Sequence, residues 1–352
     1  SQAEWRRPIT RMAEVITAIV LLIGGIHPLL DMGRPDRILN IFRYGRLQSP
    51  LLWDVVSITA YFAASTVYLF IPMIPDIANL RDRGTRPQWL YRFLAWGWTG
   101  TERQKHVLER AISILMVLVI PIAVSVHTVI SYIFAMTLQP GWHSTIFGPY
   151  FVVGAIYSGI AALLILMLIS RKVFHLEDYL KPIHFCYLGT LLLVMSLLWF
   201  YFTFSEYLTG FFGHEPNELA VFWYKFSGDY APLFWLMVFC NFLLPVLLLS
   251  FKRTKTLTGI FVASVGVVVG MWLERLIIVV PSLANPRLPY PRGIYVPSLV
   301  EWSLFAGAAA SFVLGYLLFA KFFPLISIWE VREGEDQSVA EVTKRIESYM
   351  PG

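Results

Sequence analysis

The chain has 352 residues, of which 57% are hydrophobic and only 14% are charged. Soluble globular domains carry about 25% charged residues, so the composition excludes a soluble multidomain protein and indicates a polytopic membrane protein. The net charge of +5 does not indicate nucleic-acid binding, because in a membrane protein the side on which Lys and Arg lie matters more. Two cysteines, Cys186 and Cys240, exclude a disulfide framework, a zinc site and a cysteine-ligated iron–sulfur cluster within the chain.

Eight apolar segments of about 20 residues are each long enough to cross a membrane as a helix. They lie near residues 12–30, 51–74, 111–136, 147–170, 184–210, 232–251, 256–280 and 298–323. Helices are expected because no runs of alternating residues predict barrel strands. Prolines inside two segments, Pro121 and Pro245, predict kinks at which neighbouring helices satisfy the backbone. We therefore predict a transmembrane helical domain over residues 1–324 and a cytoplasmic tail over 325–352.

Lys and Arg are distributed unequally between the two sides that these segments define. The side with the N-terminus, the 75–110 loop and the tail carries 20 of them, the other side carries 7, and Arg275 lies inside a segment. Cytoplasmic loops are enriched in Lys and Arg, so both termini are predicted to be cytoplasmic. The long basic loop at 75–110 is interpreted as an ordinary loop of this kind.

Ionisable residues inside the apolar segments are candidate functional residues, because burying them in a membrane is costly. His127 lies nine residues before Met136, roughly 14 Å along a helix and near mid-membrane, and Tyr132 follows further around the helix. Glu274 and Arg275 are adjacent and point roughly 100° apart, so they are poorly placed to neutralise each other and each is expected to need a partner on another helix. The other members of the group are Glu206, His27, Asp31, Asp54 and the loop residue His143.

By the predicted topology this group lies in the outer half of the membrane, which is what oxidation of a membrane-soluble quinol requires. A quinol loses two protons with two electrons, so its head group needs a His or Tyr partner and carboxylates that carry protons away. The isoprenoid tail needs only an apolar cleft between helices. Structural interpretations stay open: His127 can bond a neighbouring helix, Glu274 and Arg275 can be buried pairs, and Asp54 can be a first-turn acid.

A haem within this chain is not expected. A b-type haem needs two axial ligands at one depth on facing helices, and on the outer side only His27 and His127 are candidates. Electrons should therefore leave to a partner on the side where the quinol is oxidised, and no metal site is predicted.

Several segments that carry these residues make the sequence recognisable. They include GIHPLLDMGRP, SVHTVISYIFA, PGWHSTIFGPYFVVGAIYSG, FSEYLTGFFG and VGMWLERLIIVVPSL, of which PGWHSTIF and MWLER are the most specific. With these segments the chain resembles the NrfD/polysulfide-reductase membrane subunit family, most closely the subunits ActC and ActF of bacterial alternative complex III.

The resemblance implies two four-helix bundles in a bacterial inner membrane, surrounded by lipid, with no covalently bound cofactor and no nucleic-acid partner. It implies menaquinol oxidation near the periplasmic face, with electrons passing to an iron–sulfur (ActB-like) subunit and then to c-type haems of cytochrome subunits. A second NrfD-like membrane paralogue would accompany this chain, and proton translocation is part of the expectation.

Carried over by motif, His127 would belong to the quinone and proton region, and Glu206, Glu274 and Arg275 would line the proton route. The quinone-binding set would be His127, Tyr132, His27, Asp31, Asp54 and His143. The chain departs from the ActC pattern in two ways: two N-terminal helices are expected to be missing from it, and Ile133 stands where many ActC relatives have an acid.

Two other functions remain open from the sequence. The chain can be a non-catalytic membrane anchor or proton-conducting paralogue, similar to ActF, without quinone turnover. It can also be a secondary transporter that uses the same polar cluster. A transporter would be expected to show inverted repeats with broken helices in matching halves, of which the sequence carries only a weak echo, LER at 108–110 and 273–275.

Overall fold

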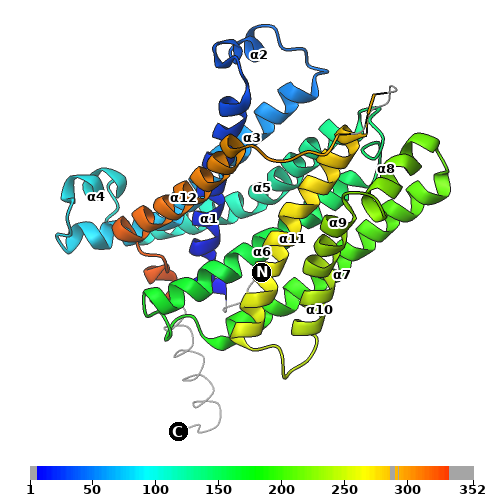
Figure 1. Cartoon of the computed structure of the whole chain (residues 1–352). Coiled ribbons are helices and arrows are strands. Elements are labelled where there is room, and N and C mark those ends of the chain that lie inside the picture. Colours follow the sequence, from blue (N-terminus) through cyan, green and yellow to red (C-terminus); the bar gives the residue numbers. More distant parts are fainter. Residues whose placement is uncertain (1–5, 286–289, 292, 333–352) are drawn as a thin grey trace. The chain divides into compact units, whose positions relative to one another are not determined.

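The computed structural model describes residues 6–285, 290–291 and 293–332, and all regular secondary structure in this part of the chain is helical. Eight helices there are long and apolar enough to span a membrane, which confirms the predicted all-α polytopic fold (Figure 1). They are α1 (Arg7–Asp31), α3 (Pro50–Asp82), α5 (Glu102–Ala135), α6 (Phe147–Val173), α7 (Pro182–Gly213), α9 to α10 (Ala231–Leu249), α11 (Leu257–Ala284) and α12 (Leu299–Phe322). The shorter elements are η2 (Pro35–Arg37), α2 (Asn40–Arg43), α4 (Gln88–Leu94) and α8 (Pro216–Phe226). Residues 333–352 of the predicted tail lie outside the described residues.

The chain divides into two compact units, and each contains the greater part of four spanning helices. Unit 1 comprises Ser1–Asp36, Ile58–Ile122 and Leu304–Gly352, which include α1, most of α3, the first part of α5 and most of α12. Unit 2 comprises Arg37–Ser57 and Ala123–Ser303, which include the end of α5 and all of α6, α7, α9 to α10 and α11. Unit 1 therefore draws its helices from both ends of the sequence.

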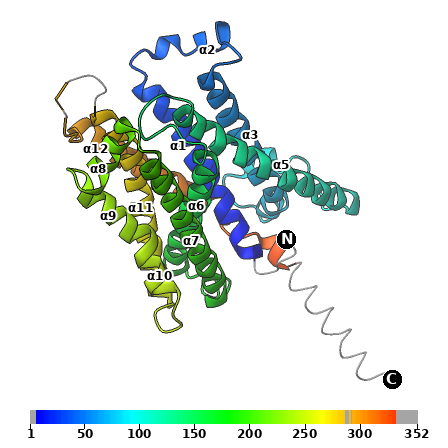
Figure 2. The ribbon, with the colours of Figure 1, turned by 90° about the vertical axis from the view of Figure 1, so that its right-hand side faces the viewer.

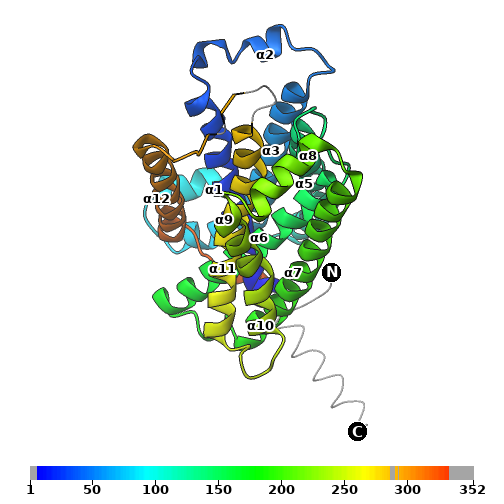
Figure 3. The same cartoon turned by 45° about the vertical axis from the view of Figure 1, so that its right-hand side comes forward.

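Unit 2 contains a closed four-helix bundle. Helix α6 packs on both α7 and α11, and the helix that runs from α9 to α10 packs on the same two helices (Figures 2 and 3). Helix α8 lies against α7, α9 and α11. Side chains of α6, α7 and α11 are buried along their length, so this bundle forms the apolar core of the unit.

Pro245 interrupts a spanning helix of this bundle in the way that the sequence predicts. A π-turn, η3 (Phe239–Leu243), separates α9 from α10 (Leu244–Leu249). Since Pro245 has no N–H, the carbonyl of Asn241 four residues earlier lacks its helical donor. The hydroxyls of Tyr157 and Ser196 on the neighbouring helices donate to it instead, at 2.7 and 2.8 Å.

Unit 1 is held at one end by a buried ion pair. The Arg11 guanidinium on α1 donates to the Asp76 carboxylate on α3, and the two side chains are 2% and 0% exposed. Asp76 also accepts the backbone N–H groups of Ile328 and Trp329, both at 3.1 Å. These bonds fasten the segment after α12 to α1 and α3.

The basic 75–110 loop packs within unit 1 and is not simply a solvent-exposed connection between two helices. It contains α4, whose Tyr91 is buried and donates its hydroxyl to the carbonyl of Phe322 at 2.9 Å. Tyr91 and Ala95 pack in one core cluster with Met73 and Ile77 of α3. Burial raises the pKa of the Tyr91 hydroxyl above its ordinary value. The loop is therefore part of the packed core of unit 1.

Candidate functional site

The centre of the unit 2 bundle contains one buried carboxylate, that of Glu274 on α11, which is 1% exposed. The indole of the fully buried Trp199 on α7 donates to its Oε1 at 2.6 Å. The Arg275 guanidinium stacks over the ring of Phe151 on α6, 4.0 Å from its centroid. Both residues thus find the partners on other helices that the sequence predicts.

The expectation that these two neighbours are poorly placed to neutralise each other is wrong. Arg275 Nη2 lies 3.6 Å from Glu274 Oε2, too far for a hydrogen bond but close enough for an ion pair. The long arginine side chain bends back toward the preceding residue, so the angle between the two Cα–Cβ bonds does not decide their separation. The guanidinium is also partly exposed, and this lowers the cost of its charge.

His127 lies near the end of α5 that belongs to unit 2. Its ring is half-buried, and its Nδ1 is 2.8 Å from the carbonyl of Ala123 one turn earlier. The Arg275 charge is within electrostatic range of the ring. Because a carbonyl only accepts, Nδ1 carries the proton, and Nε2 of the neutral ring is then an acceptor. The side chain of Tyr132 is 40% exposed.

The PGWHSTIF segment and the preceding residue, Gln139, close one end of the bundle through four hydrogen bonds. Gln139 donates to the carbonyl of Ser282 at 2.7 Å, and the Trp142 indole donates to the carbonyl of Ile278 at 2.6 Å. The backbone N–H of Gly141 donates to Glu218 Oε2 at 2.7 Å, and the Ser144 hydroxyl donates to the Glu206 carboxylate. Two carboxylates from α7 and α8 therefore hold this loop in place.

Gly141 is required at its position in this loop. Its φ is +79°, in the left-handed region, where a side chain is strained. A Cβ there would lie 3.0 Å from Ser282 Oγ and 3.6 Å from Lys225 Nζ. The loop backbone thus comes close enough to α11 and α8 to cover the groups beneath it.

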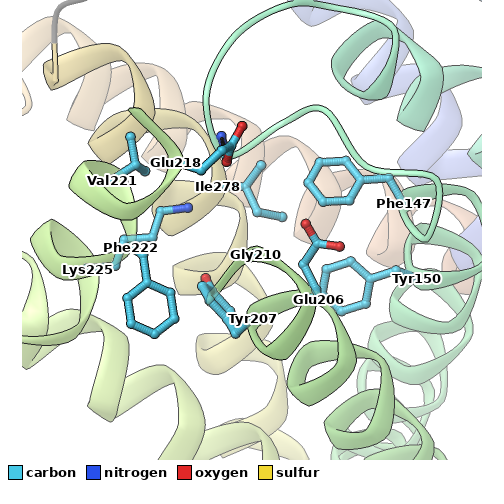
Figure 4. Close-up of a pocket in the computed structure, with 11 residues that line it drawn as sticks. Phe147, Tyr150, Glu206, Tyr207, Gly210, Glu218, Val221, Phe222, Lys225 and Ile278 are labelled. Carbon is cyan, nitrogen blue, oxygen red and sulfur yellow. Dashed lines mark hydrogen bonds between the residues drawn. The ribbon is translucent and has the colours of Figure 1, made fainter. Parts of the chain in front are cut away.

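A cavity of about 50 Å³ lies beneath this loop (Figure 4). Its polar lining consists of Glu206, Tyr207, Glu218 and Lys225, and Phe147 and Tyr150 of α6 form part of the wall. The Lys225 side chain is 4% exposed and lies within electrostatic range of both carboxylates. Burial lowers the pKa of its amine to about 8, although the Glu206 and Glu218 charges act in the opposite direction.

The volume of this cavity decides what it can hold. An apolar cavity of about 150 Å³ accommodates a benzene molecule, whereas a water needs roughly 10–15 Å³ of probe-occupied space. A two-ring naphthoquinone head group therefore does not fit beside Glu206 as the side chains stand, but a few waters do. This cavity is therefore not the place of a quinone head group.

The remaining predicted site residues are Asp54, His143, His27 and Asp31. Asp54 is half-buried in the second turn of α3, which begins at Pro50, so the interpretation as a first-turn acid is wrong. His143 is exposed although its loop neighbours are bonded. His27 belongs to unit 1, where its Nδ1 is 2.9 Å from the carbonyl of Ile23. Asp31 ends α1, and its side chain lies outside what the structure describes.

Lys225, Glu218 and Trp199 are site residues that the sequence reasoning missed. In the sequence, Lys225 is one of the Lys and Arg residues in the connections between spanning segments, and nothing else about it entered the prediction. One signal was present: it lies in the run VFWYKF, where four aromatic residues surround the single cation. A lysine in such a run is a candidate for burial, because aromatic residues cover its stem.

The fold and this site define a class: a polytopic helical membrane protein with a buried carboxylate and protonatable groups inside one bundle. The family model of polysulphide reductase, NrfD, matches residues 1–286. The chain therefore belongs to the NrfD family, as its motifs predict.

Three relatives are similar to the chain over most of its length. A putative dimethyl sulfoxide reductase membrane subunit of Halobacterium salinarum is 26% identical over 81% of the chain and 63% of its own length. A selenate reductase subunit of Mesobacillus selenatarsenatis is 26% identical over 91% of the chain and 78% of its own length. The Hdr-like menaquinol oxidoreductase integral membrane subunit of Archaeoglobus fulgidus is 24% identical, over 92% and 78%. The chain thus spans less than two thirds of the first relative.

Proposed function

We propose that this chain is the quinone-interacting membrane subunit of a multisubunit respiratory oxidoreductase. The single observation that carries the proposal is the polar cluster of unit 2, with His127, Glu274 and Arg275 in a family that includes a menaquinol oxidoreductase subunit. Menaquinol is the proposed substrate. Alternative complex III, with chains similar to ActC and ActF, is the proposed assembly.

In this proposal the quinol head group lies at the surface of α5, beside His127 and Tyr132. A quinol hydroxyl donates to Nε2 of His127, which the Nδ1 contact with Ala123 leaves as the acceptor. The partly exposed Arg275 stacks on the ring of Phe151, and its charge lies within electrostatic range of the imidazole.

Oxidation of one quinol yields one quinone, two electrons and two protons. The electrons pass to a partner's iron–sulfur cluster, a one-electron acceptor, and from there to c-type haems of cytochrome subunits. The protons leave through the carboxylates of unit 2, toward the side with few Lys and Arg, which is the periplasmic side. In this proposal Glu274, bonded to Trp199, and Glu206, bonded to Ser144, are the carboxylates that carry the protons.

The test is menaquinol oxidation by the purified complex, wild type against His127→Ala. His106→Ala is the matched control, since His106 is an exposed histidine on the same helix. We expect at least a tenfold loss of turnover for His127→Ala alone, about 1.4 kcal/mol of lost stabilisation of the rate-limiting step. Partner retention is measured in each preparation. Unchanged turnover in an intact complex would exclude His127 as a catalytic residue and favour a membrane anchor without quinone turnover.

A further inference from the structure

The cavity beneath the PGWHSTIF loop is lined by a buried cation, Lys225, that the proposed function does not use. Lys225 is a lysine with a side chain almost entirely removed from solvent, at a short helix between two spans. Burying a cation costs free energy, which Met or Leu at this position would avoid, and the Glu206 and Glu218 carboxylates in the same cavity offset part of that cost.

The groups that face Lys225 come from three helices. Glu206 and Tyr207 belong to α7, Glu218 belongs to the same helix as Lys225, and Tyr150 belongs to α6. Helix α11 contributes Ile278 to the wall. Figure 4 shows these side chains around one space, with the lysine amine and the two carboxylates on different sides of it.

Water is the partner that this arrangement requires. Among the described residues no hydrogen bond links Lys225 Nζ to a protein acceptor, although an amine or ammonium has two or three donors to satisfy. A cavity of about 50 Å³ with several polar walls meets the size and polarity conditions for buried water. Glu206 and Glu218 both line this cavity, so water inside it has acceptors on the protein as well as the Lys225 donor.

We propose that this cavity is a water-filled proton-accepting site, in which the Lys225 amine takes up a proton released by quinol oxidation and passes it to the outside water. The inference rests on the proposed function for the source of the proton. The step balances for each proton in turn: Glu206 transfers one proton through the cavity water, the neutral amine gains it and becomes an ammonium, and the ammonium releases it to the outside water before the second proton of the same quinol follows. The two electrons of the quinol go to the iron–sulfur acceptor of the partner.

The charge on Lys225 can change under working conditions, because burial brings the pKa of its amine to about 8. The acceptor is the neutral amine, so turnover should increase as pH rises through about 8. Glu218→Gln keeps an oxygen that can accept from the Gly141 N–H but removes the negative charge that favours the ammonium. It should therefore move this increase to lower pH, by about one pH unit.

Two measurements on the intact complex test the proposal. The first is the pH profile of menaquinol oxidation for wild type, Lys225→Met, Glu218→Gln and the control Lys252→Met, whose lysine is exposed. We expect the turnover of Lys225→Met at pH 8 to be at least fivefold lower than that of wild type and not to increase with pH. Lys252→Met should have the turnover of wild type and the same increase with pH. A Lys225→Met profile that matches wild type in rate and shape would overturn the proposal.

The second measurement needs no turnover. Trace acetylation with acetic anhydride is followed by mass spectrometry of the Lys225 peptide across pH, normalised to Lys252. We expect a reactivity midpoint near pH 8 that moves down in Glu218→Gln. A midpoint that is the same in both proteins would overturn the role of the cavity, even if Lys225→Met does not assemble. If wild type oxidises no quinol, the proposed function fails, and the labelling still reports on the site.

Discussion

The ion pair of Arg11 and Asp76 offers a quantitative test of the packing of unit 1. Asp76→Asn would leave the Arg11 guanidinium, 2% exposed, without a counterion in an apolar environment. Removal of one partner from a buried pair costs about 3–5 kcal/mol, because the remaining charge is uncompensated. Two backbone N–H donors from Ile328 and Trp329 also lose part of their charged acceptor. We therefore expect the free energy of unfolding to fall by about 4 kcal/mol.

The double variant separates the charge effect from the loss of packing. Arg11→Met keeps most of the side-chain volume and should cost a similar amount alone, since Asp76 is then the unpaired charge. Arg11→Met with Asp76→Asn should cost about 1–2 kcal/mol, so the coupling energy is several kcal/mol. Asp36→Asn is the matched control, because Asp36 forms an exposed pair with Arg34 and should change stability by less than about 0.5 kcal/mol.

The assay is reversible unfolding of the purified protein by SDS titration, followed by circular dichroism. Two results would refute the reasoning: a cost of Asp76→Asn below about 1 kcal/mol, or a double variant whose cost equals the sum of the single costs. The first would mean that the pair is hydrated. The second would mean that the two side chains act independently.

Two further substitutions test the unit 2 site by the same unfolding assay. Trp199→Phe removes the indole donor to the buried Glu274 carboxylate and should lower the free energy of unfolding by about 2–4 kcal/mol. The control Trp235→Phe, whose indole is exposed, should lower it by less than about 1 kcal/mol. Equal effects of the two substitutions would contradict the bond between Trp199 and Glu274. Gly141→Ala adds crowding against Ser282 to left-handed strain, whereas Gly84→Ala, with φ +70° and open space, adds strain alone. Gly141→Ala should thus be the more destabilising, by about 1 kcal/mol or more, and the opposite order would show that the loop adjusts.

Much of the fold could be predicted from local properties of the sequence. Segments such as the one around Pro245 are apolar over a membrane thickness, and a helix there is the form that satisfies its backbone. The missing N–H of Pro245 also implies that the Asn241 carbonyl needs a donor, although Tyr157 and Ser196 could not be named. Hydropathy and the missing N–H of a proline are properties of residues that are close in the sequence, so a single sequence is enough to identify them.

The partners of the buried charged groups could not be predicted from the sequence. Glu274 and Trp199 are 75 residues apart, and Arg11 and Asp76 are 65 residues apart, so no local pattern joins them. Lys225 shows the same limit: its residue type and spacing agree with a solvated loop, and its burial arises only because α8 packs against α7, α9 and α11.

The sequence by itself determined that this chain is a helical membrane protein of the NrfD family, with histidines and carboxylates inside its spans. That information is local, because hydropathy over about 20 residues decides whether a segment crosses a membrane. Only the tertiary structure decided which acid is buried against an indole and which lysine lies in a cavity. Those properties depend on solvent exposure and on distances of a few ångströms, which helix packing sets and residue order does not.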